Sequence, residues 1–334
     1  HLSIRRQRQM CIRDSPYPES VSLVLPIFNE EEVIPLLLPR LDALIEKIPC
    51  ETEIIFVNDG SSDGSQRLLE ECCQEKPNRK LISLARNFGH QAAASAGLDY
   101  AQGQVVVLMD ADLQDPPELV LSMIDKYCSG YDVVYARRTS REGETSFKRF
   151  TAWAFYRIMK TLVHKELPVD VGDFRLMSRR CLDALNVMRE THRFLRGMVT
   201  WIGFPQTAVE FARPARAAGQ TKYPLRKMLL FAWNAALSFS PLPLRLGFAV
   251  GSLLFCFGAI YMVWAAILKV LGLYAVPGWT SLIGVICAVG GANMIFLGIV
   301  GEYVARIYEE SKRRPLYVVS ASCNLQTTPY PPTL

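Results

Sequence analysis

Short apolar runs alternate with amphipathic stretches along the first half of this chain. Each run ends in polar or small residues, and each amphipathic stretch repeats its apolar positions at helical intervals. Strands that alternate with helices of about ten to fifteen residues predict an α/β fold with a mostly parallel sheet covered on both faces. The expected strands lie within 21–29, 53–65, 80–89, 105–109 and 132–138.

Two later segments, 246–268 and 276–301, are apolar and contain no charged residue. Each exceeds the roughly 20 residues that a helix needs to cross about 30 Å of hydrocarbon. Because only a short linker separates them, they predict a hairpin of two transmembrane helices, at about 246–268 and 278–301. A buried helix pair of a soluble protein is the alternative, but such helices seldom run this long without a charge.

Basic residues predict the orientation of this hairpin. Arg226, Lys227 and Arg245 precede the first segment, and Lys269 alone lies between the two. Arg306 and a basic cluster at 312–314 follow the second segment. The positive-inside rule therefore places both ends in the cytoplasm, at the inner membrane. Cysteines without a CxxC pair agree with a reducing compartment and predict no zinc site or disulfide framework. The net charge of +5 is mild, and no basic and aromatic groove indicates a nucleic-acid binder.

These patterns divide the chain into five parts. Residues 1–20 have no signal-peptide core and are expected to be disordered or foreign to the natural start. The soluble domain covers 21–222, and 223–243 has the apolar spacing of an amphipathic helix lying in the lipid headgroups. The hairpin occupies 244–303 and a cytoplasmic tail 304–334.

Polar residues follow the predicted strands at the sheet edge where open α/β proteins bind ligands. These residues are Asn29, Glu30, Asp59, Asp110 and Asp112. Mg²⁺ and Mn²⁺ bind through one or two carboxylates together with substrate phosphates. Asp110 and Asp112 therefore predict half of a metal site that a diphosphate completes, with Gln114 as a further ligand. A solvated acidic turn is the alternative, and neither a GxGxxG nor a P-loop motif is present to indicate another nucleotide site.

Five motifs in this order resemble the family 2 glycosyltransferases with a GT-A fold: LPIFNEEE, FVNDGSSDGS, DADLQDPPE, GDFRLMSRR and GQTKY. The similarity covers about 21–315 and is closest to the polyprenyl-phosphate branch, which includes dolichol-phosphate mannosyltransferases and bactoprenol glucosyltransferases. It implies a Rossmann-like GT-A domain with a two-helix membrane hairpin, a nucleotide-sugar donor, Mg²⁺ or Mn²⁺, and inverting transfer to a polyprenyl phosphate. The relatives also suggest a homotetramer.

The resemblance also implies residue roles. Asp173 matches the catalytic carboxylate near the acceptor, although an N-cap before an amphipathic helix is an alternative role. Arg138 is expected at the acceptor phosphate. Arg216 and Lys222 lie in the basic stretch just before the predicted membrane segments, where Arg and Lys residues commonly contact lipid headgroups. That is the alternative to a role in donor binding. The implied donor-binding residues are Pro26, Asn29, Glu30, Asp59, Asp110, Ala111, Arg137, Arg216 and Lys222, and the implied metal ligands are Asp110, Asp112 and Gln114.

The predicted function is transfer of glucose from UDP-glucose to undecaprenyl phosphate, and mannose- or aminoarabinose-type donors are the alternatives. An aspartyl-phosphate phosphatase would carry Thr at Gln114, and a processive polysaccharide synthase would carry a QxxRW motif that is missing here. A non-catalytic nucleotide-sugar sensor or membrane scaffold would be expected to lack the metal carboxylates or Asp173, and all are present.

Overall fold

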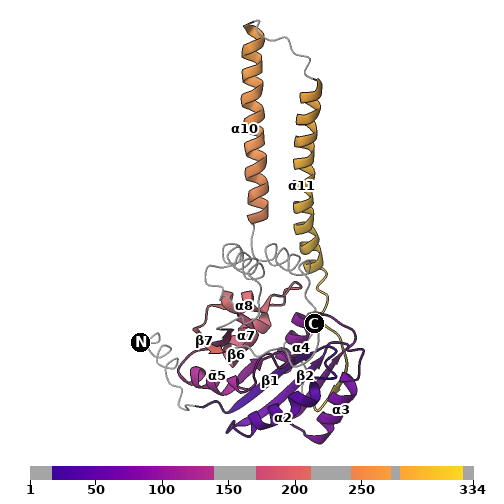
Figure 1. Ribbon diagram of the computed structural model, residues 1–334, viewed down its shortest axis with the longest axis vertical. Helices are drawn as coiled ribbons and strands as arrows, with labels where there is room; N and C mark the ends of the chain where they lie inside the picture. Colours follow the sequence, from indigo (N-terminus) through magenta and orange to yellow (C-terminus); the bar gives the residue numbers. More distant parts are fainter. Residues whose placement is uncertain (1–16, 139–170, 212–241, 272–278, 326–334) are drawn as a thin grey trace. The chain divides into compact units, whose positions relative to one another are not determined.

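The computed structural model describes residues 17–138, 171–211, 242–271 and 279–325. The chain divides into two compact units. The first is an α/β domain, which includes the C-terminal segment from Pro315 onward, and the second contains two long helices (Figure 1). The predicted α/β class is therefore confirmed.

The described residues form an eight-stranded sheet in the order β7-β5-β6-β4-β1-β2-β3-β8. Strands β1 to β4 are parallel to their neighbours within that group, whereas β6 runs antiparallel to β4 and β5, and β8 antiparallel to β3. The five expected strands are confirmed, while β6, β7 and β8 were not expected. The strands are β1 (Ser20–Ile27), β2 (Glu51–Asn58), β3 (Arg79–Leu84), β4 (Val105–Leu108), β5 (Val133–Arg138), β6 (Val171–Ser178), β7 (Gln206–Phe211) and β8 (Val319–Cys323).

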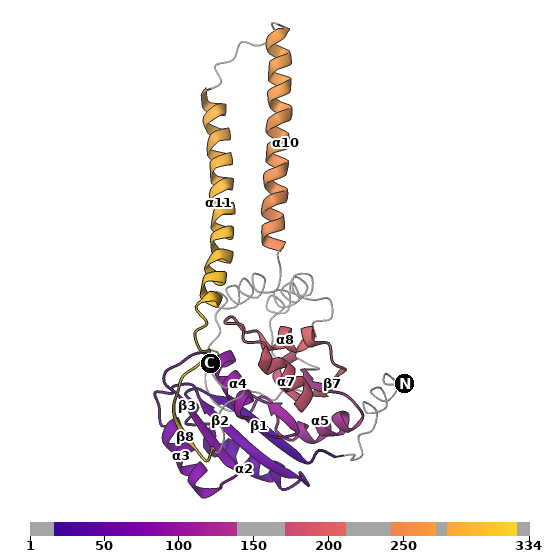
Figure 2. The ribbon, with the colours of Figure 1, turned by 180° about the vertical axis from the view of Figure 1, so that it is seen from behind.

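Helices cover both faces of this sheet (Figures 1 and 2). One face packs on α2 (Ile34–Ile45), α3 (Ser65–Glu75) and α5 (Leu119–Cys128). The other face packs on α4 (His90–Tyr100) and α7 (Arg179–Val187), and α8 (Leu195–Ile202) packs on α7.

Small residues let α4 approach the sheet closely. A Cβ added at Gly97 would lie 2.3 Å from Cγ1 of Val24 and 3.0 Å from Cγ2 of Val57. Val24 and Val57 are fully buried on β1 and β2. This close approach holds the first turn of α4 beside the carboxyl ends of the central strands.

The second unit contains α10 (Leu242–Val270) and α11 (Trp279–Ser311), which contact each other. Helix α10 includes the whole predicted segment 246–268, and α11 includes 279–301. No helix among the described residues was found to be both long and apolar enough to span a membrane. The predicted interfacial helix 223–243 lies almost entirely outside the described residues.

Candidate active site

Asp110 and Asp173 lie opposite each other at the end of the antiparallel pair β4–β6. The register pairs Leu108 with Arg175, and its continuation by two residues pairs Asp110 with Asp173. Asp173 is 6% exposed, whereas about a third of the Asp110 side chain is accessible. The two carboxylates are therefore directed to one point at the sheet edge predicted to bind ligand.

Asp173 lies inside strand β6, so the alternative that it caps a helix is wrong. The cap of α7 is Ser178, whose side chain accepts a hydrogen bond from the backbone N–H of Cys181. The segment from Val171 to Ser178 is buried throughout and pairs with both β4 and β5 as a strand. The helix begins only at Arg179. This placement leaves the Asp173 carboxylate available to other partners.

His90, the first residue of α4, lies between the two carboxylates. Its Nε2 atom is 3.5 Å from Oδ1 of Asp110 and 3.3 Å from Oδ2 of Asp173. Burial opposes the charged imidazole, but the hydrogen bond to Asp173 and the charge of Asp110 outweigh it and raise the pKa of His90 to about 9. A protonated His90 offsets the repulsion between the two acids.

Three further side chains surround Asp173. Arg196 Nε donates to Oδ1 at 2.7 Å, Gln91 Nε2 donates to Oδ2 at 3.2 Å, and Arg175 Nη2 lies 3.7 Å from Oδ1. Burial favours the neutral acid, but the charge of Arg196 and the hydrogen bond from His90 hold the pKa of Asp173 well below its usual range. Asp173 is therefore an ionised, firmly oriented carboxylate.

Asp110 is the less compensated of the two acids, because its ion pair is with His90, whereas Asp173 also contacts two arginine side chains. Burial raises its pKa, the charge of His90 lowers it in part, and the Asp173 and Asp112 carboxylates raise it again. A divalent cation would relieve this cost, and two carboxylates suit Mg²⁺ or Mn²⁺ when substrate oxygens complete the coordination. Among the described residues, no group of three or more His, Cys, Asp or Glu side chains could hold a metal ion by itself.

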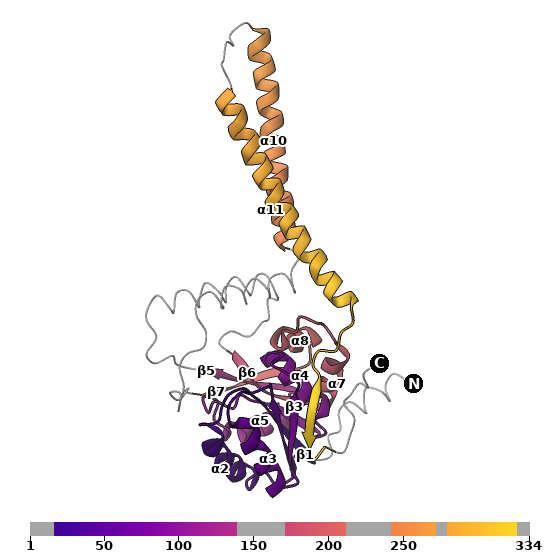
Figure 3. The same ribbon diagram turned by 90° about the vertical axis from the view of Figure 1, so that its right-hand side faces the viewer.

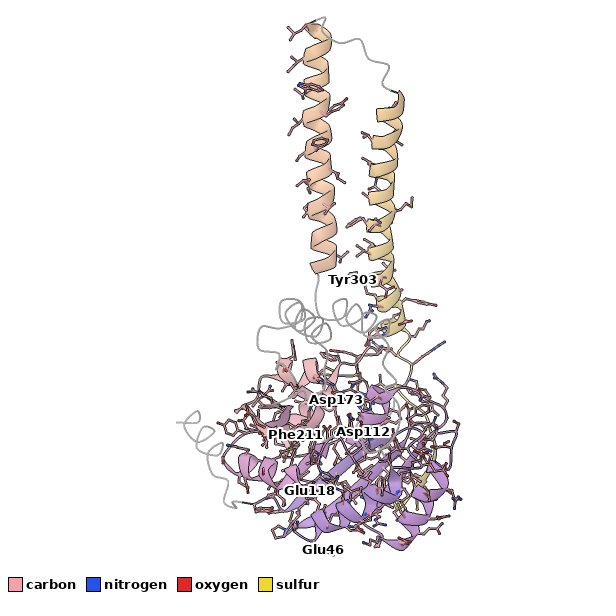
Figure 4. All side chains as sticks on the ribbon, viewed as in Figure 1. Glu46, Asp112, Glu118, Asp173, Phe211 and Tyr303 are labelled. Atoms are coloured by element: carbon pink, nitrogen blue, oxygen red, sulfur yellow. The ribbon has the colours of Figure 1, made fainter. Side chains whose placement is uncertain are left out.

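The turn after β4 shapes this half-site. Leu113 has a positive φ of 59°, and the backbone N–H of Gln114 donates to Oδ1 of Asp112 at 3.1 Å. Ala111 is buried between the two acids. The turn fits a cation held by Asp110 and Asp112. Figure 4 labels Asp112 together with Asp173 in the α/β domain.

Asp59 orders the loop that leads into α4. Its Oδ1 atom accepts from the N–H of Phe88 at 2.7 Å and its Oδ2 atom from the N–H of Gly89 at 3.0 Å. Gly60 has a φ of 66°, and a Cβ there would lie 2.5 Å from the carbonyl carbon of Arg86. This contact between the loops after β2 and β3 positions His90, a role for Asp59 that sequence analysis missed.

The loop after β1 packs against the same region. Oδ1 of Asn29, a residue with a positive φ of 55°, accepts from the N–H of Ser62 at 2.8 Å. The N–H of Glu30 donates to Oγ of Ser65 at 3.0 Å. Pro26 is buried in β1, the strand between β2 and β4. The structure therefore brings these three predicted residues to the sheet edge that carries Asp59 and Asp110.

The predicted basic residues are less completely described. Arg137 lies on β5, and its Nη1 atom is 3.6 Å from Oε1 of Glu210 on β7. The Arg138 side chain, Arg216 and Lys222 lie outside the described residues. Arg175, considered as a structural partner of acids, donates to the backbone oxygens of Gly172 and Asp173 and contacts the Asp173 carboxylate.

Sequence analysis missed His90, Gln91 and Arg196. The first two open the helix after the third predicted strand, so their position at the ligand-binding edge was a usable signal. Arg196 lies on α8 and reaches Asp173 only through tertiary packing. No local pattern indicates that contact.

Comparison with known proteins shows the family of this chain. Residues 22–185 match the family model described as glycosyl transferase family 2, and residues 242–307 match the GtrB C-terminal hairpin. The Bacillus subtilis protein named uncharacterised glycosyltransferase YkcC is 46% identical over 91% of this chain and 94% of its own. The Escherichia coli prophage bactoprenol glucosyl transferase homolog is 37% identical over 90% of this chain and 98% of its own. A Shigella phage SfV bactoprenol glucosyl transferase is also 37% identical, over 90% and 97% of the two chains.

Proposed function

Since the chain belongs to glycosyl transferase family 2, we propose that it transfers glucose from UDP-glucose to a polyprenyl phosphate, with inversion. The observation that carries the proposal is the convergence of Asp110 and Asp173 on His90 at the ligand-binding edge. Relatives named bactoprenol glucosyl transferase match 90% of the chain, which supports glucose as the sugar and undecaprenyl phosphate as the acceptor.

The donor would bind along the ends of β1, β2 and β4. Asn29, Glu30 and Asp59 offer acceptors to the hydroxyl and N–H groups of a nucleoside, with Pro26 and Ala111 lining the same edge. Asp110 and Asp112, aided by Gln114, would hold Mg²⁺ or Mn²⁺, which when bound neutralises the diphosphate of the leaving nucleotide. The basic residues proposed for phosphate are Arg137, Arg216 and Lys222 for the donor and Arg138 for the acceptor.

Asp173 would act at the acceptor. A phosphate monoester has a second pKa of about 6 and is largely ionised near neutral pH, so it needs little activation as a nucleophile. The ionised Asp173 orients the acceptor and takes its last proton when one is present. The phosphate oxygen then attacks the anomeric carbon as the bond to the nucleoside diphosphate breaks, which inverts the configuration. Positioning and charge compensation supply most of the acceleration in this scheme.

The hairpin would bring the site to its lipid substrate. The match to the GtrB hairpin and the uncharged sequences at 246–268 and 276–301 support insertion of α10 and α11 into the inner membrane. The basic residues that flank them support a cytoplasmic catalytic domain. A homotetramer is part of the same proposal, and cross-linking in membranes would test it.

The test uses purified full-length protein in detergent with undecaprenyl phosphate, Mn²⁺ or Mg²⁺, and a panel of labelled nucleotide sugars. We expect label from UDP-glucose to enter the organic phase, with rates at least about 100-fold lower in Asp112→Ala and Asp173→Asn. Transfer from a mannose or aminoarabinose donor, and not from UDP-glucose, would show that the proposed sugar is wrong. Binding of nucleotide with no transfer to lipid would overturn the proposed acceptor.

A further inference from the structure

Asp99, near the C-terminal end of α4, is a buried carboxylate that joins three segments of the α/β domain. Its side chain is 1% exposed. Arg189 Nη1 donates to both of its oxygens, at 2.7 and 2.9 Å, and the hydroxyl of Tyr317 donates to Oδ2 at 2.7 Å. A buried charge is tolerated only with such partners, so these contacts determine how the three segments pack together at Asp99.

Two of the three segments carry the side chains that hold Asp173. Helix α4 begins with His90 and Gln91, and the chain from Arg189 continues into α8, which carries Arg196. Gln91 links the two, because its Nε2 atom donates to Asp173 while its Oε1 atom accepts from the N–H of Leu195 at 3.0 Å. The Asp99 junction therefore fixes α4 relative to the segment that supplies Arg196.

The third segment is the C-terminal one, which follows α11 in the chain. Strand β8 pairs with β3 at the edge of the sheet (Figure 3), and the N–H of Ala85 donates to the carbonyl of Val318 at 2.9 Å. Tyr317 is the next residue toward the hairpin. The C-terminal segment therefore holds the chain between Ala85 and Asp99 at both ends, and that stretch contains the loop bound by Asp59 and the start of α4.

We propose that Tyr317 is a positioning residue for the transfer reaction, acting through Asp99 on the placement of α4 and hence of His90 and Gln91 around Asp173. This inference rests on the proposed function. Helix α4 has 11 residues, about 16 Å from end to end at 1.5 Å per residue, and it transmits the constraint as a rigid element. An error of about 1 Å at a reacting group lowers a rate by up to roughly 100-fold.

The geometry predicts an effect on the rate of transfer and not on donor binding. Tyr317→Phe removes one hydroxyl and leaves the main-chain pairing of β8 with β3 in place. We expect kcat to fall about tenfold, while KM for the donor stays within about twofold, since a group needed only in the transition state affects kcat. Asp99→Asn should lower kcat in the same way.

Ser320→Ala is the matched control. Ser320 also lies on the C-terminal segment, and its hydroxyl donates to the carbonyl of Ser83 on β3 at 3.0 Å. Both variants lose one hydroxyl contact of the same segment. Only Tyr317→Phe should lower kcat and increase amide hydrogen exchange in residues 88–93.

The experiment measures label transfer to undecaprenyl phosphate and hydrogen exchange for full-length wild type, Tyr317→Phe and Ser320→Ala in detergent. A selective loss of kcat and of protection in Tyr317→Phe supports the proposal. Equal effects in both variants, or none in Tyr317→Phe, would overturn it. A wild type that transfers no sugar would instead contradict the proposed function, while the exchange data would still report on the coupling of Tyr317 to α4.

Discussion

His90 Nε2 lies 3.3 Å from Oδ2 of Asp173, and the same nitrogen is 3.5 Å from Oδ1 of Asp110. One imidazole therefore joins the start of α4 to the ends of β4 and β6. The two acids have different proposed tasks, donor phosphate and acceptor. The shared histidine fixes the distance between the two carboxylates and offsets the repulsion between them.

We expect His90→Gln to lower kcat about tenfold, because Asp173 loses a charged hydrogen-bond donor and its repulsion with Asp110 is no longer offset. Donor KM should change less, since the residues proposed for the nucleoside are untouched. Steady-state transfer kinetics measure both constants.

His192→Gln is the control for His90→Gln. His192 is an exposed histidine of the same domain, and its replacement should leave kcat unchanged. If His90→Gln kept wild-type kcat, the histidine would serve folding alone.

The acids after β4 predict dependence on a divalent cation. EDTA should abolish transfer, and added Mn²⁺ or Mg²⁺ should restore it. Asp112→Asn should increase the metal concentration for half-maximal rate at least about tenfold, because a neutral amide is a weaker ligand for a hard cation. A titration of activity against metal measures this.

Glu118→Gln provides the comparison for the metal titration. Glu118, labelled in Figure 4, follows the same loop. It pairs with Arg40 at 2.7 Å, and both side chains are partly exposed. Its replacement should leave the metal requirement unchanged. Full activity of the wild type after exhaustive chelation would contradict a metal-assisted reaction.

The predicted part of the fold follows from local patterns. The strands that end at Ile27, Asn58 and Leu84 are apolar runs followed closely by polar residues, and they alternate with helical patterns. The parallel centre of the sheet was therefore predictable. Asp59 and Asp110 were predictable for the same reason, since parallel strands bring their carboxyl ends to one edge.

The rest depends on contacts distant in sequence. Strand β6 was not expected, because the helical pattern that begins at Arg179 dominates the local signal. Its pairing between β4 and β5 is a tertiary choice, as is the addition of β8 to β3. The contacts of Asp173 with Gln91 and Arg196 depend on that choice.

Stability away from the site should depend on the pair formed by Asp42 and Arg79. Arg79 is 3% exposed, and its Nη2 atom donates to both Asp42 oxygens, at 2.8 and 2.9 Å. Asp42→Asn removes the negative charge opposite this buried guanidinium, which keeps Glu75 and the carbonyl of Cys72 as partners, and should lower the free energy of unfolding by about 2 kcal/mol. Urea unfolding of the detergent-solubilised protein measures the change.

The same pair predicts a pH dependence. Burial opposes ionisation of Asp42, but hydrogen bonds from Lys76 and Arg79 outweigh it and lower its pKa from 3.8. The stabilisation is therefore complete above about pH 4 and is lost as the pH falls through the lowered value. The difference between wild type and Asp42→Asn should shrink below pH 4. Glu71→Gln, in an exposed pair with Arg67, should cost less than about 1 kcal/mol at any pH.

Gln91 allows its two hydrogen bonds to be separated. Gln91→Glu keeps an oxygen to accept from the N–H of Leu195 but replaces the amide that donates to Asp173 with a second negative charge. We expect kcat to fall at least about tenfold while the melting temperature changes little. The added repulsion should also raise the pKa of Asp173, so the remaining activity should decline at a higher pH on the acid side than in the wild type. Gln91→Met removes both hydrogen bonds and should lower the melting temperature as well. If Gln91→Glu retained full activity, the contact between Gln91 and Asp173 would have no part in catalysis.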